Sequence, residues 1–239
     1  MGIVLITGSG KRIGRGLAIS FAEKGWDVII HYNTSEEKAK ETENHIKNLG
    51  VKAVIVKADI RNYQEIKDAF ESGVKEVGMP DVLVNNAGIY PPPTQLKDIS
   101  DRMWDDTLNI NLRGEYYFSK IFSVKAKEGR IINFSSLGGL EVWKHRIPYN
   151  VSKAGVIQLT KALAKELAPN FSVNCICPGT IEIPEEPPIE KTKINVDKIP
   201  MNRYGNVNDI FDAVYFFSNC SKFITGQVLC VDGGYHIAR

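Results

Sequence analysis

Seven short, strongly apolar runs recur along the chain, and longer amphipathic stretches separate them. The runs read GIVLIT, WDVIIHY, KAVIVKA, DVLVNN, GRIINFS, SVNCIC and QVLCVDG, and the amphipathic stretches cover residues 12–24, 36–49, 62–77, 101–127, 150–168 and 207–219. Strands that are apolar on both faces and alternate with helices are typical of a parallel sheet covered on both sides. Because crossovers between parallel strands are right-handed, the pattern predicts an α/β fold with a doubly wound sheet of about seven strands. Ligands bind such sheets outside the carboxyl ends of the strands, so site residues are expected there.

The length and charge of the chain narrow its class. It has 239 residues, enough for one large domain, which we expect to span residues 1–239. The formal net charge is +2 and no long basic block occurs, which argues against a nucleic-acid partner. No apolar run approaches the roughly 20 residues that span a membrane, and GIVLIT follows no basic leader segment. We therefore expect a cytoplasmic protein without a membrane partner.

Four cysteines are present: Cys175, Cys177, Cys220 and Cys230. The first two stand two apart within an apolar strand run, so both face the same side of the strand. A metal site would need further ligands at suitable spacing, and no paired C-x-x-C occurs. Free, buried thiols and no bound metal are the prediction.

One long stretch, residues 178–200, fits neither strand nor helix. Its prolines exclude a long helix, and its length is unusual for a plain connection. Because it follows the carboxyl end of a strand run, we predict a substrate lid over residues 180–200. The alternative is a disordered surface excursion.

A glycine-containing loop, TGSGKRIG, joins the first strand run to the first helical stretch. Gly8, Gly10 and Gly14 permit positive φ angles and close backbone approach, and the following helix start offers free N–H groups to a pyrophosphate. Ile13 stands where the third glycine of G-x-G-x-x-G is expected. The loop by itself leaves open whether the glycines serve a nucleotide or only the geometry of the turn.

Tyr149 and Lys153 stand four apart at the start of a helical stretch, which places both side chains on one face. A free tyrosine has a pKa of about 10, and a nearby ammonium group stabilises the phenolate and lowers that pKa. Such a pair can give a proton to a carbonyl oxygen. A surface tyrosine beside a solvated lysine would show the same spacing.

Seven motifs occur together in a fixed order: TGSGKRIGRG, NNAG, WDDTLNINLRG, GRIINFSS, YNVSK, VNCICPG and ITGQVLCVDGG. Over nearly its whole length the chain thereby resembles the short-chain dehydrogenase/reductase family. The resemblance implies a single Rossmann-like domain, a nicotinamide cofactor and an oxidoreductase activity. It also implies a homodimer or homotetramer assembled through residues 101–127 and 150–168, which are richer in apolar residues than one sheet face requires.

The resemblance assigns roles to four catalytic residues. Tyr149 matches the acid/base, and Lys153 matches the lysine that binds the nicotinamide ribose and lowers the tyrosine pKa. Ser136 matches the serine that hydrogen-bonds the substrate carbonyl, with Ser135 as the alternative one position off. Asn111 matches the asparagine that holds a proton-relay water.

The resemblance also implies a set of cofactor contacts. Besides Tyr149 and Lys153, they are Gly8, Lys11, Arg12, Ile13 and Gly14 in the first loop; Asn33, Thr34 and Ser35 after the second strand; Asp59 and Ile60; Asn86, Ala87 and Gly88; and Pro178, Gly179 and Ile181. Two positions depart from the family pattern: Arg12 replaces a glycine, and Ile183 replaces a threonine that would contact the cofactor.

The residues after the second strand run favour NADP(H), with NAD(H) also usable. An NAD site needs an acidic residue there to hold the ribose 2′-hydroxyl, but no carboxylate occurs before Glu36. Asn33, Thr34 and Ser35 can donate to phosphate oxygens, and Arg12 can reach them from the neighbouring loop. We therefore predict that this region binds the 2′-phosphate.

Several activities remain open. Two segments near the end of the chain resemble those of reductases that act on 3-oxoacyl thioesters of acyl carrier protein, or of general carbonyl reductases. They read IPMNRYGNVNDI and ITGQVLCVDGG. TGSGKRIG, HYNTS and DGGYHIAR are similar to pteridine reductases, although Ser136 stands where those often carry aspartate. A sugar or polyol dehydrogenase is a third possibility. A nucleotide sensor without catalysis would be expected to lose the Tyr–Lys pair, which is retained here.

An acidic carrier protein would need a basic rim beside the cleft. Lys125, Lys127 and Arg130 are candidates for it, but the lid begins with Glu182 and further glutamates. Because like charges slow association, we expect carrier-linked substrates to be no better than small thioesters or diketones.

Overall fold

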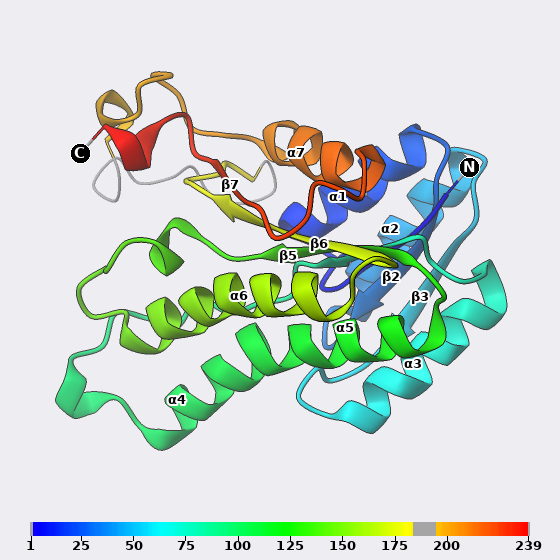
Figure 1. The fold of residues 1–239 in the computed structure, drawn as a ribbon, viewed down its shortest axis with the longest axis horizontal. Helices are drawn as coiled ribbons and strands as arrows, with labels where there is room; N and C mark the ends of the chain where they lie inside the picture. Colours follow the sequence, from blue (N-terminus) through cyan, green and yellow to red (C-terminus); the bar gives the residue numbers. More distant parts are fainter. Residues whose placement is uncertain (1, 184–194, 239) are drawn as a thin grey trace.

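Seven parallel strands form one sheet in a computed structural model that describes residues 2–183 and 195–238 (Figure 1). In chain order they are β1 (Ile3–Ile6), β2 (Asp27–Tyr32), β3 (Ala53–Lys57), β4 (Val82–Asn85), β5 (Gly129–Phe134), β6 (Phe171–Pro178) and β7 (Val228–Val231). Their spatial order is β3-β2-β1-β4-β5-β6-β7, and every neighbouring pair is parallel. The predicted doubly wound sheet is confirmed.

Helices cover both faces of the sheet (Figure 1). One face carries α1 (Arg12–Glu23), α2 (Glu36–Asn48) and α7 (Val207–Asn219), and the other carries α3 (Tyr63–Val77), α4 (Asp101–Leu108), α5 (Gly114–Lys125) and α6 (Ile147–Glu166). Side chains alternate between the two cores along each strand: in β1, Val4 and Ile6 belong to the first core and Leu5 to the second. This two-sided burial explains why the strand sequences are apolar throughout.

Two helix boundaries differ from the sequence prediction. The single helix expected over 101–127 is divided into α4, a π-helical turn at Asn109–Arg113 and α5. The helix expected from residue 150 begins at Ile147, because Pro148 is well suited to a first helical turn. Tyr149 therefore lies in the first turn of α6. Short 3₁₀ turns occur at Leu96–Asp98, Leu137–Gly139, Val196–Lys198 and Tyr235–Ile237.

The strand order reverses between β1 and β4, which are neighbours in the sheet although two strands separate them in sequence. At such a switch point the connections leave in opposite directions and open a crevice at the carboxyl ends of the strands. The loops after β1, β4 and β5 therefore meet at one edge, where the sequence motifs lie.

The predicted lid is only partly described, since residues 184–194 lie outside the described residues. At its start, Glu182 N donates to Gly205 O at 2.8 Å, and Gly205 N donates to Thr180 O at 3.0 Å. Ile183 is buried, which accounts for an apolar residue at a position where the family has threonine. Cys175 and Cys177 are buried and all four cysteines are free, as predicted.

Candidate active site

Ser136 and Tyr149 meet at Gly138, beyond the carboxyl end of β5. Ser136 Oγ accepts a hydrogen bond from Gly138 N at 3.2 Å. A Cβ atom on Gly138 would lie 3.0 Å from Tyr149 Cε1 and 3.1 Å from the Trp143 ring, so only glycine lets the tyrosine ring pack this closely. The serine hydroxyl and the tyrosine thus border one small region, as the resemblance implied.

Ser135 serves a different purpose from Ser136. Its Oγ donates to the main-chain oxygen of Lys153 at 2.7 Å, so the hydroxyl ties α6 to the end of β5. A hydroxyl engaged with buried backbone is a poor donor to a substrate. The structure therefore favours Ser136 over the alternative that the sequence left open.

Lys153 is buried beneath this region, and its side chain is 6% exposed. Its Nζ donates to Phe134 O at 2.6 Å and lies 3.5 Å from Glu115 Oε1. Burial raises the pKa of Glu115 to about 8, and the attraction of Lys153 only partly opposes that shift. We call Lys153, Glu115 and Phe134 the catalytic floor. The sequence analysis missed Glu115, because 38 positions separate it from its partner Lys153 in the chain.

Asn111 lies in the π-helical turn and is completely buried. Its Oδ1 accepts from Ile89 N at 2.8 Å, and its Nδ2 donates to Ile89 O at 2.9 Å and to Ser152 Oγ at 3.1 Å. Both Nδ2 protons are used and Oδ1 already accepts one bond, so the main chain of Asn111 is the more open place for a relay water. A Cβ on Gly88 would lie 3.3 Å from Asn111 Oδ1 and 3.6 Å from Lys153 Nζ, so Gly88 keeps space open beside the lysine.

Two aromatic rings and an arginine line the approach to Tyr149. The Tyr90 ring meets Tyr149 edge-on at 4.7 Å between centroids, and the Trp143 ring lies nearly parallel to Tyr149 at 6.1 Å. Arg146 stacks over Tyr90 at 4.0 Å and donates to Pro91 O. We call Tyr90, Trp143 and Arg146 the aromatic wall. These residues follow no transferable motif, so the sequence analysis assigned them no role.

The glycine loop is a tight turn, but only one of its two positive φ angles is at a glycine. Gly8 has φ +66° and Arg12 has φ +57°, whereas Gly10 and Gly14 have ordinary φ angles. A Cβ on Gly14 would lie 2.4 Å from Gly8 O, so Gly14 is needed for close approach. Arg12 thus occupies a conformation that favours glycine. Ile13 is half-buried against the core under the loop.

Thr7 joins the glycine loop to the NNAG turn. Its Oγ1 accepts from Asn86 N at 3.0 Å and from Ala87 N at 2.9 Å, while Asn86 Nδ2 donates to Thr7 O at 2.9 Å. The space above Gly8 is closed by Ala87, whose Cα would lie 3.0 Å from a Cβ at position 8. The two motifs therefore form one rigid surface, and Thr7 is a supporting residue that the sequence did not single out.

His31 supports the same loop from below and was also missed. Its Nδ1 accepts from Gly8 N at 3.1 Å, so Nε2 carries the proton and donates to Ala58 O at 3.1 Å. Complete burial lowers the pKa of His31 to about 4. The neutral ring connects the ends of β1, β2 and β3.

The residues predicted to hold a 2′-phosphate share one exposed region, which we call the cofactor rim: Lys11, Arg12, Asn33, Thr34 and Ser35. Gly10 links the loop to this region, since a Cβ there would lie 3.4 Å from Ser35 O. The first carboxylate after β2, Glu36, pairs with Lys40 at 2.6 Å along its own helix.

Asp59 and Ile60 follow β3. The Asp59 carboxylate accepts from Arg61 Nη2 at 2.6 Å, and this pairing lowers the pKa of Asp59. Ile60 is buried against Gly114, where a Cβ would lie 2.9 Å from Ile60 Cδ1. Asp59 thus borders the site, whereas the side chain of Ile60 packs inward.

Pro178, Gly179 and Ile181 continue from β6 past the same edge. Gly179 N donates to Val231 O at 2.9 Å, and a Cβ at position 179 would lie 2.7 Å from Asp232 Cβ. Ile181 pairs with Gly205 in an isolated parallel bridge. These contacts fix the backbone that the resemblance places against the nicotinamide.

The proposed basic rim for a carrier protein is wrong. Arg130 lies at the amino end of β5 and donates to Cys220 O at 3.0 Å, and Lys125 pairs with Glu71 at 2.7 Å. Ser136 follows the opposite end of β5, so these cations face away from the cleft. The prediction relied on the short distance in sequence between Arg130 and Ser136. The whole of β5 separates the two residues in space.

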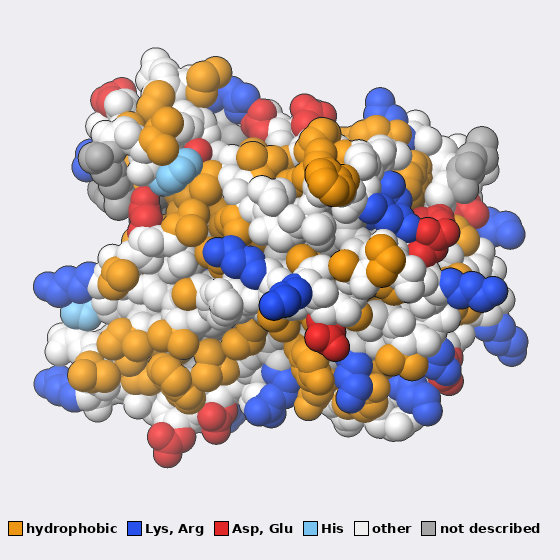
Figure 2. All heavy atoms as spheres, viewed as in Figure 1, with side chains coloured by type: hydrophobic (Ala, Val, Ile, Leu, Met, Phe, Trp, Pro, Cys, Tyr) orange, Lys and Arg blue, Asp and Glu red, His pale blue; other side chains and the backbone are white. Residues whose placement is uncertain are grey.

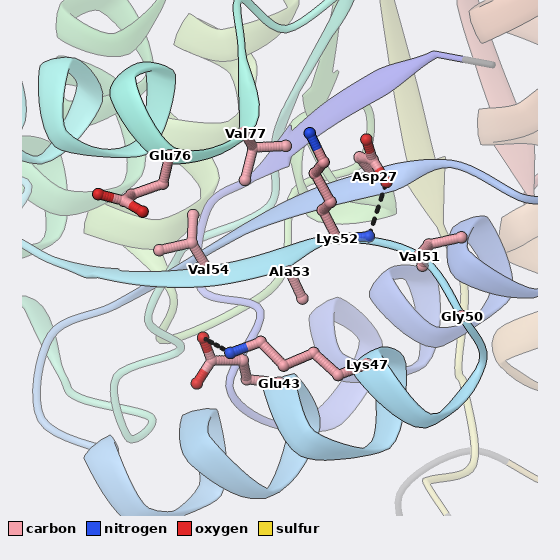
Figure 3. A pocket seen from close by; sticks show the side chains of 10 residues that line it. All are labelled: Asp27, Glu43, Lys47, Gly50, Val51, Lys52, Ala53, Val54, Glu76 and Val77. Carbon is pink, nitrogen blue, oxygen red and sulfur yellow. Dashed lines mark hydrogen bonds and ion pairs between the residues drawn. The ribbon is translucent and has the colours of Figure 1, made fainter.

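A surface hollow of about 800 Å³ lies at the amino ends of β2 and β3 (Figure 3). Asp27 and Glu43 line it, and they are engaged by Lys52 N at 2.7 Å and Lys47 Nζ at 2.9 Å. The hollow lies at the amino ends of the strands, the opposite end of the sheet from the glycine loop, Ser136 and Tyr149. The candidate site is therefore the carboxyl edge.

Two other site types were considered. Among residues 2–183 and 195–238, no group of three or more His, Cys, Asp or Glu side chains could hold a metal ion. Within the same ranges, no helix is long and apolar enough to cross a membrane.

Comparison with known proteins agrees with this geometry. Residues 8–236 match the family model described as Enoyl-(Acyl carrier protein) reductase. The chain is 35% identical over 240 residues to the 3-oxoacyl-[acyl-carrier-protein] reductase FabG of Staphylococcus aureus strain Mu50, covering 98% of this chain and 97% of the relative.

Solved structures show the same architecture. An actinorhodin polyketide ketoreductase variant with NADPH is 30% identical, with a TM-score of 0.89 and coverage of 98% of this chain and 97% of that chain. A short-chain dehydrogenase from Burkholderia cenocepacia J2315 in complex with NADP is 30% identical, with a TM-score of 0.90 and the same coverage. The chain belongs to the short-chain dehydrogenase/reductase family and is an oxidoreductase.

Proposed function

We propose that the protein is an NADPH-dependent reductase that converts a carbonyl group to an alcohol, with Tyr149 as the proton donor. The observation that carries the proposal is the convergence of Ser136 and Tyr149 on Gly138, with the buried Lys153 one helical turn further along α6. A 3-oxoacyl thioester is the favoured substrate, because the FabG relative matches over almost the entire length of both chains.

The residues fit a dinucleotide. Gly8 and Gly14 would hold the pyrophosphate at the start of α1, where helix N–H groups attract anions. Asp59 and the Asn86–Gly88 turn would border the adenosine, and the segment from Pro178 would border the nicotinamide. Space beside Lys153 is available because Gly88 has no side chain.

Bound NADPH supplies the hydride that reduces the carbonyl carbon. Tyr149 gives its phenolic proton to the carbonyl oxygen as negative charge develops there, and Ser136 donates a hydrogen bond to the same oxygen. The Lys153 ammonium, one helical turn further along α6, stabilises the phenolate that remains. The main chain of Asn111 would hold the water that returns the proton.

The residues of the cofactor rim select NADPH over NADH. Lys11 and Arg12 bring two positive charges to this region, and the first carboxylate after β2, Glu36, is paired with Lys40. Charge-assisted hydrogen bonds to a phosphate contribute about 1.5–3 kcal/mol each. Two structural relatives, one solved with NADPH and one in complex with NADP, support this choice.

A planar heterocycle is the second candidate substrate, as in a pteridine reductase. The observation that favours it is the aromatic wall, because Trp143 and Tyr90 offer ring faces and edges beside Tyr149. Aromatic side chains stack well on flat conjugated ligands.

We further propose that the protein acts in the cytoplasm as a homodimer or homotetramer. Hydrophobic side chains gather on the lower face in Figure 2, over α4 and α5. Tyr116 on α5 and Val151 on α6 are 40% and 44% exposed, and a contiguous exposed apolar surface is typical of an interface. Light scattering that gave the mass of one chain would contradict this assembly.

The proposed function is tested by a turnover screen with NADPH and NADH. The panel holds a small 3-oxoacyl thioester, its carrier-linked form, a diketone, a pterin and a sugar. We expect NADPH oxidation with the small thioester or the diketone, and no gain from the carrier. Tight NADPH binding with no turnover across the panel would favour a nucleotide sensor instead.

A further inference from the structure

A buried carboxyl group that the proposed reaction does not use lies beneath the catalytic lysine. Glu115 stands in the first turn of α5, and its side chain is 2% exposed. Its Oε1 lies 3.5 Å from Lys153 Nζ, the only cation that faces it among the described residues. Buried carboxylates are costly unless paired and hydrogen-bonded, so this one needs a physical account.

The surroundings of Glu115 are polar but supply no donor to its second oxygen. Within the described ranges, neither Glu115 Oε2 nor Asn85 Oδ1 has a hydrogen-bond partner. Ser119 Oγ and Asn85 Nδ2 donate to the main-chain oxygen of Glu115, at 2.7 and 3.4 Å, and leave its carboxyl group unsatisfied. The titratable groups that face Glu115 are therefore Lys153 from α6 and Cys175 from β6.

This setting allows the carboxyl group to exist in two charge states near neutral pH. Burial raises the pKa of Glu115 to about 8, so the group is mostly neutral at pH 7 and ionises as the solution becomes alkaline. A neutral carboxyl can also donate a hydrogen bond, which fits a pocket whose unpartnered atoms are acceptors.

We propose, on the basis of the proposed function, that Glu115 is a positioning residue that acts through Lys153, and that its charge sets the upper pH limit of proton donation by Tyr149. When Glu115 is neutral, the ammonium acts alone on Tyr149 and favours the phenolate. When Glu115 is ionised, its negative charge offsets the ammonium and favours the protonated phenol. Ionisation of Glu115 at rising pH thus prolongs reductase activity into the alkaline range.

The test is the pH dependence of kcat in Glu115→Gln, which keeps the shape of the side chain and removes its charge. The variant should differ least from the wild type at about pH 6.5, where Glu115 is neutral in the wild type, and the difference in kcat should grow as the pH rises. The midpoint of the alkaline limb should fall by about one pH unit, a tenfold loss of rate at a fixed alkaline pH. Glu115→Asp keeps the charge on a shorter side chain and should show a smaller shift.

Glu71→Gln is the matched control, because it removes one carboxylate from the exposed pair with Lys125, 2.7 Å apart. We expect its pH profile to overlay that of the wild type. A merely structural role for Glu115 would lower kcat or the melting temperature without moving the midpoint, and that result would overturn the proposal.

A second measurement needs neither substrate nor a folded variant. Infrared difference spectra of the wild type, recorded as the pH rises, should lose the carbonyl stretch of one protonated buried carboxyl group with a midpoint near 8. Absence of that band contradicts the proposal. Wild-type protein that shows the band but no turnover at any pH contradicts the proposed function, whereas normal turnover with an unshifted Glu115→Gln profile contradicts only the role of Glu115.

Discussion

The cofactor rim and the catalytic floor both carry charge, but in opposite surroundings. Lys11 and Arg12 on the rim are exposed, whereas Glu115 and Lys153 in the floor are 2% and 6% exposed. Beside the rim, Glu36 and Lys40 pair at 2.6 Å, closer than the 3.5 Å of the buried pair. Solvated pairs nevertheless contribute about 0–1 kcal/mol, while removing one partner of a buried pair costs about 3–5 kcal/mol. Burial outweighs distance in deciding which charges matter.

The two regions should therefore fail in different ways. A change in the floor or above it alters the proton transfer, because those groups are fixed by buried contacts. A change on the rim alters binding of the anionic cofactor, because the rim side chains are exposed and would contact the cofactor rather than the reacting atoms. Three predictions test this separation.

The largest effect is expected for Tyr149→Phe, which removes the proton donor and keeps the ring between Tyr90 and Trp143. General acid catalysis contributes about 10²–10⁴-fold, so turnover should fall by at least a hundredfold. NADPH affinity, measured by fluorescence titration, should stay close to the wild-type value. Tyr90→Phe is the matched control and should keep most of the activity. A Tyr149→Phe enzyme with a tenth of the wild-type rate would exclude the acid role.

A smaller effect is expected on the rim. Arg12→Gly removes the charge and relieves the positive φ angle, a strain of about 1 kcal/mol. NADPH affinity should fall roughly ten- to hundredfold, with little change for NADH. The free energy of unfolding in urea should rise by about 1 kcal/mol in the same variant.

Arg12→Lys separates charge from backbone strain. It keeps the positive charge and the strained conformation, so it should retain more of the NADPH preference than Arg12→Gly and gain no stability. An unchanged NADPH/NADH ratio in Arg12→Gly, or a wild type that prefers NADH, would contradict the role assigned to the rim.

The last effect is expected on stability rather than on turnover or cofactor affinity, and it concerns His31, which supports the glycine loop through Gly8 N. Its pKa is lowered from 6.5 to about 4, so its contribution is complete above about pH 6.5 and is lost as the pH falls towards 4. Between pH 7 and pH 5 the wild type should lose about 2 kcal/mol from this group. The measurement is urea unfolding at both pH values, with His31→Gln as the comparison. Equal pH dependence in the two proteins would show that His31 does not titrate as described.

The sequence predicted the fold well and the site in part, for physical reasons. Strand runs such as those of β1 and β5 are apolar on both faces, and that pattern is local. The four residues proposed as catalytic came from a family resemblance, and their roles stay predictions. Thr7, His31 and Glu115 were missed because their importance depends on partners far away in sequence.

Errors arose where local pattern and three-dimensional position diverge. The π-helical turn at Asn109–Arg113 interrupts a stretch whose periodicity appears continuous. Arg130 is only six residues from Ser136, yet a strand places the two at opposite ends of the sheet. The glycine pattern identified the loop, but the positive φ angle belongs to Arg12 rather than Gly10.

The most direct test of the separation is a single-turnover experiment with NADPH and a reducible carbonyl on three proteins: wild type, Tyr149→Phe and Arg12→Gly. NADPH affinity and the rate of NADPH oxidation are measured in the same samples. The account predicts that Tyr149→Phe binds NADPH normally and hardly oxidises it, whereas the defect of Arg12→Gly appears in NADPH affinity. Two variants that lose affinity and rate in equal proportion would contradict it.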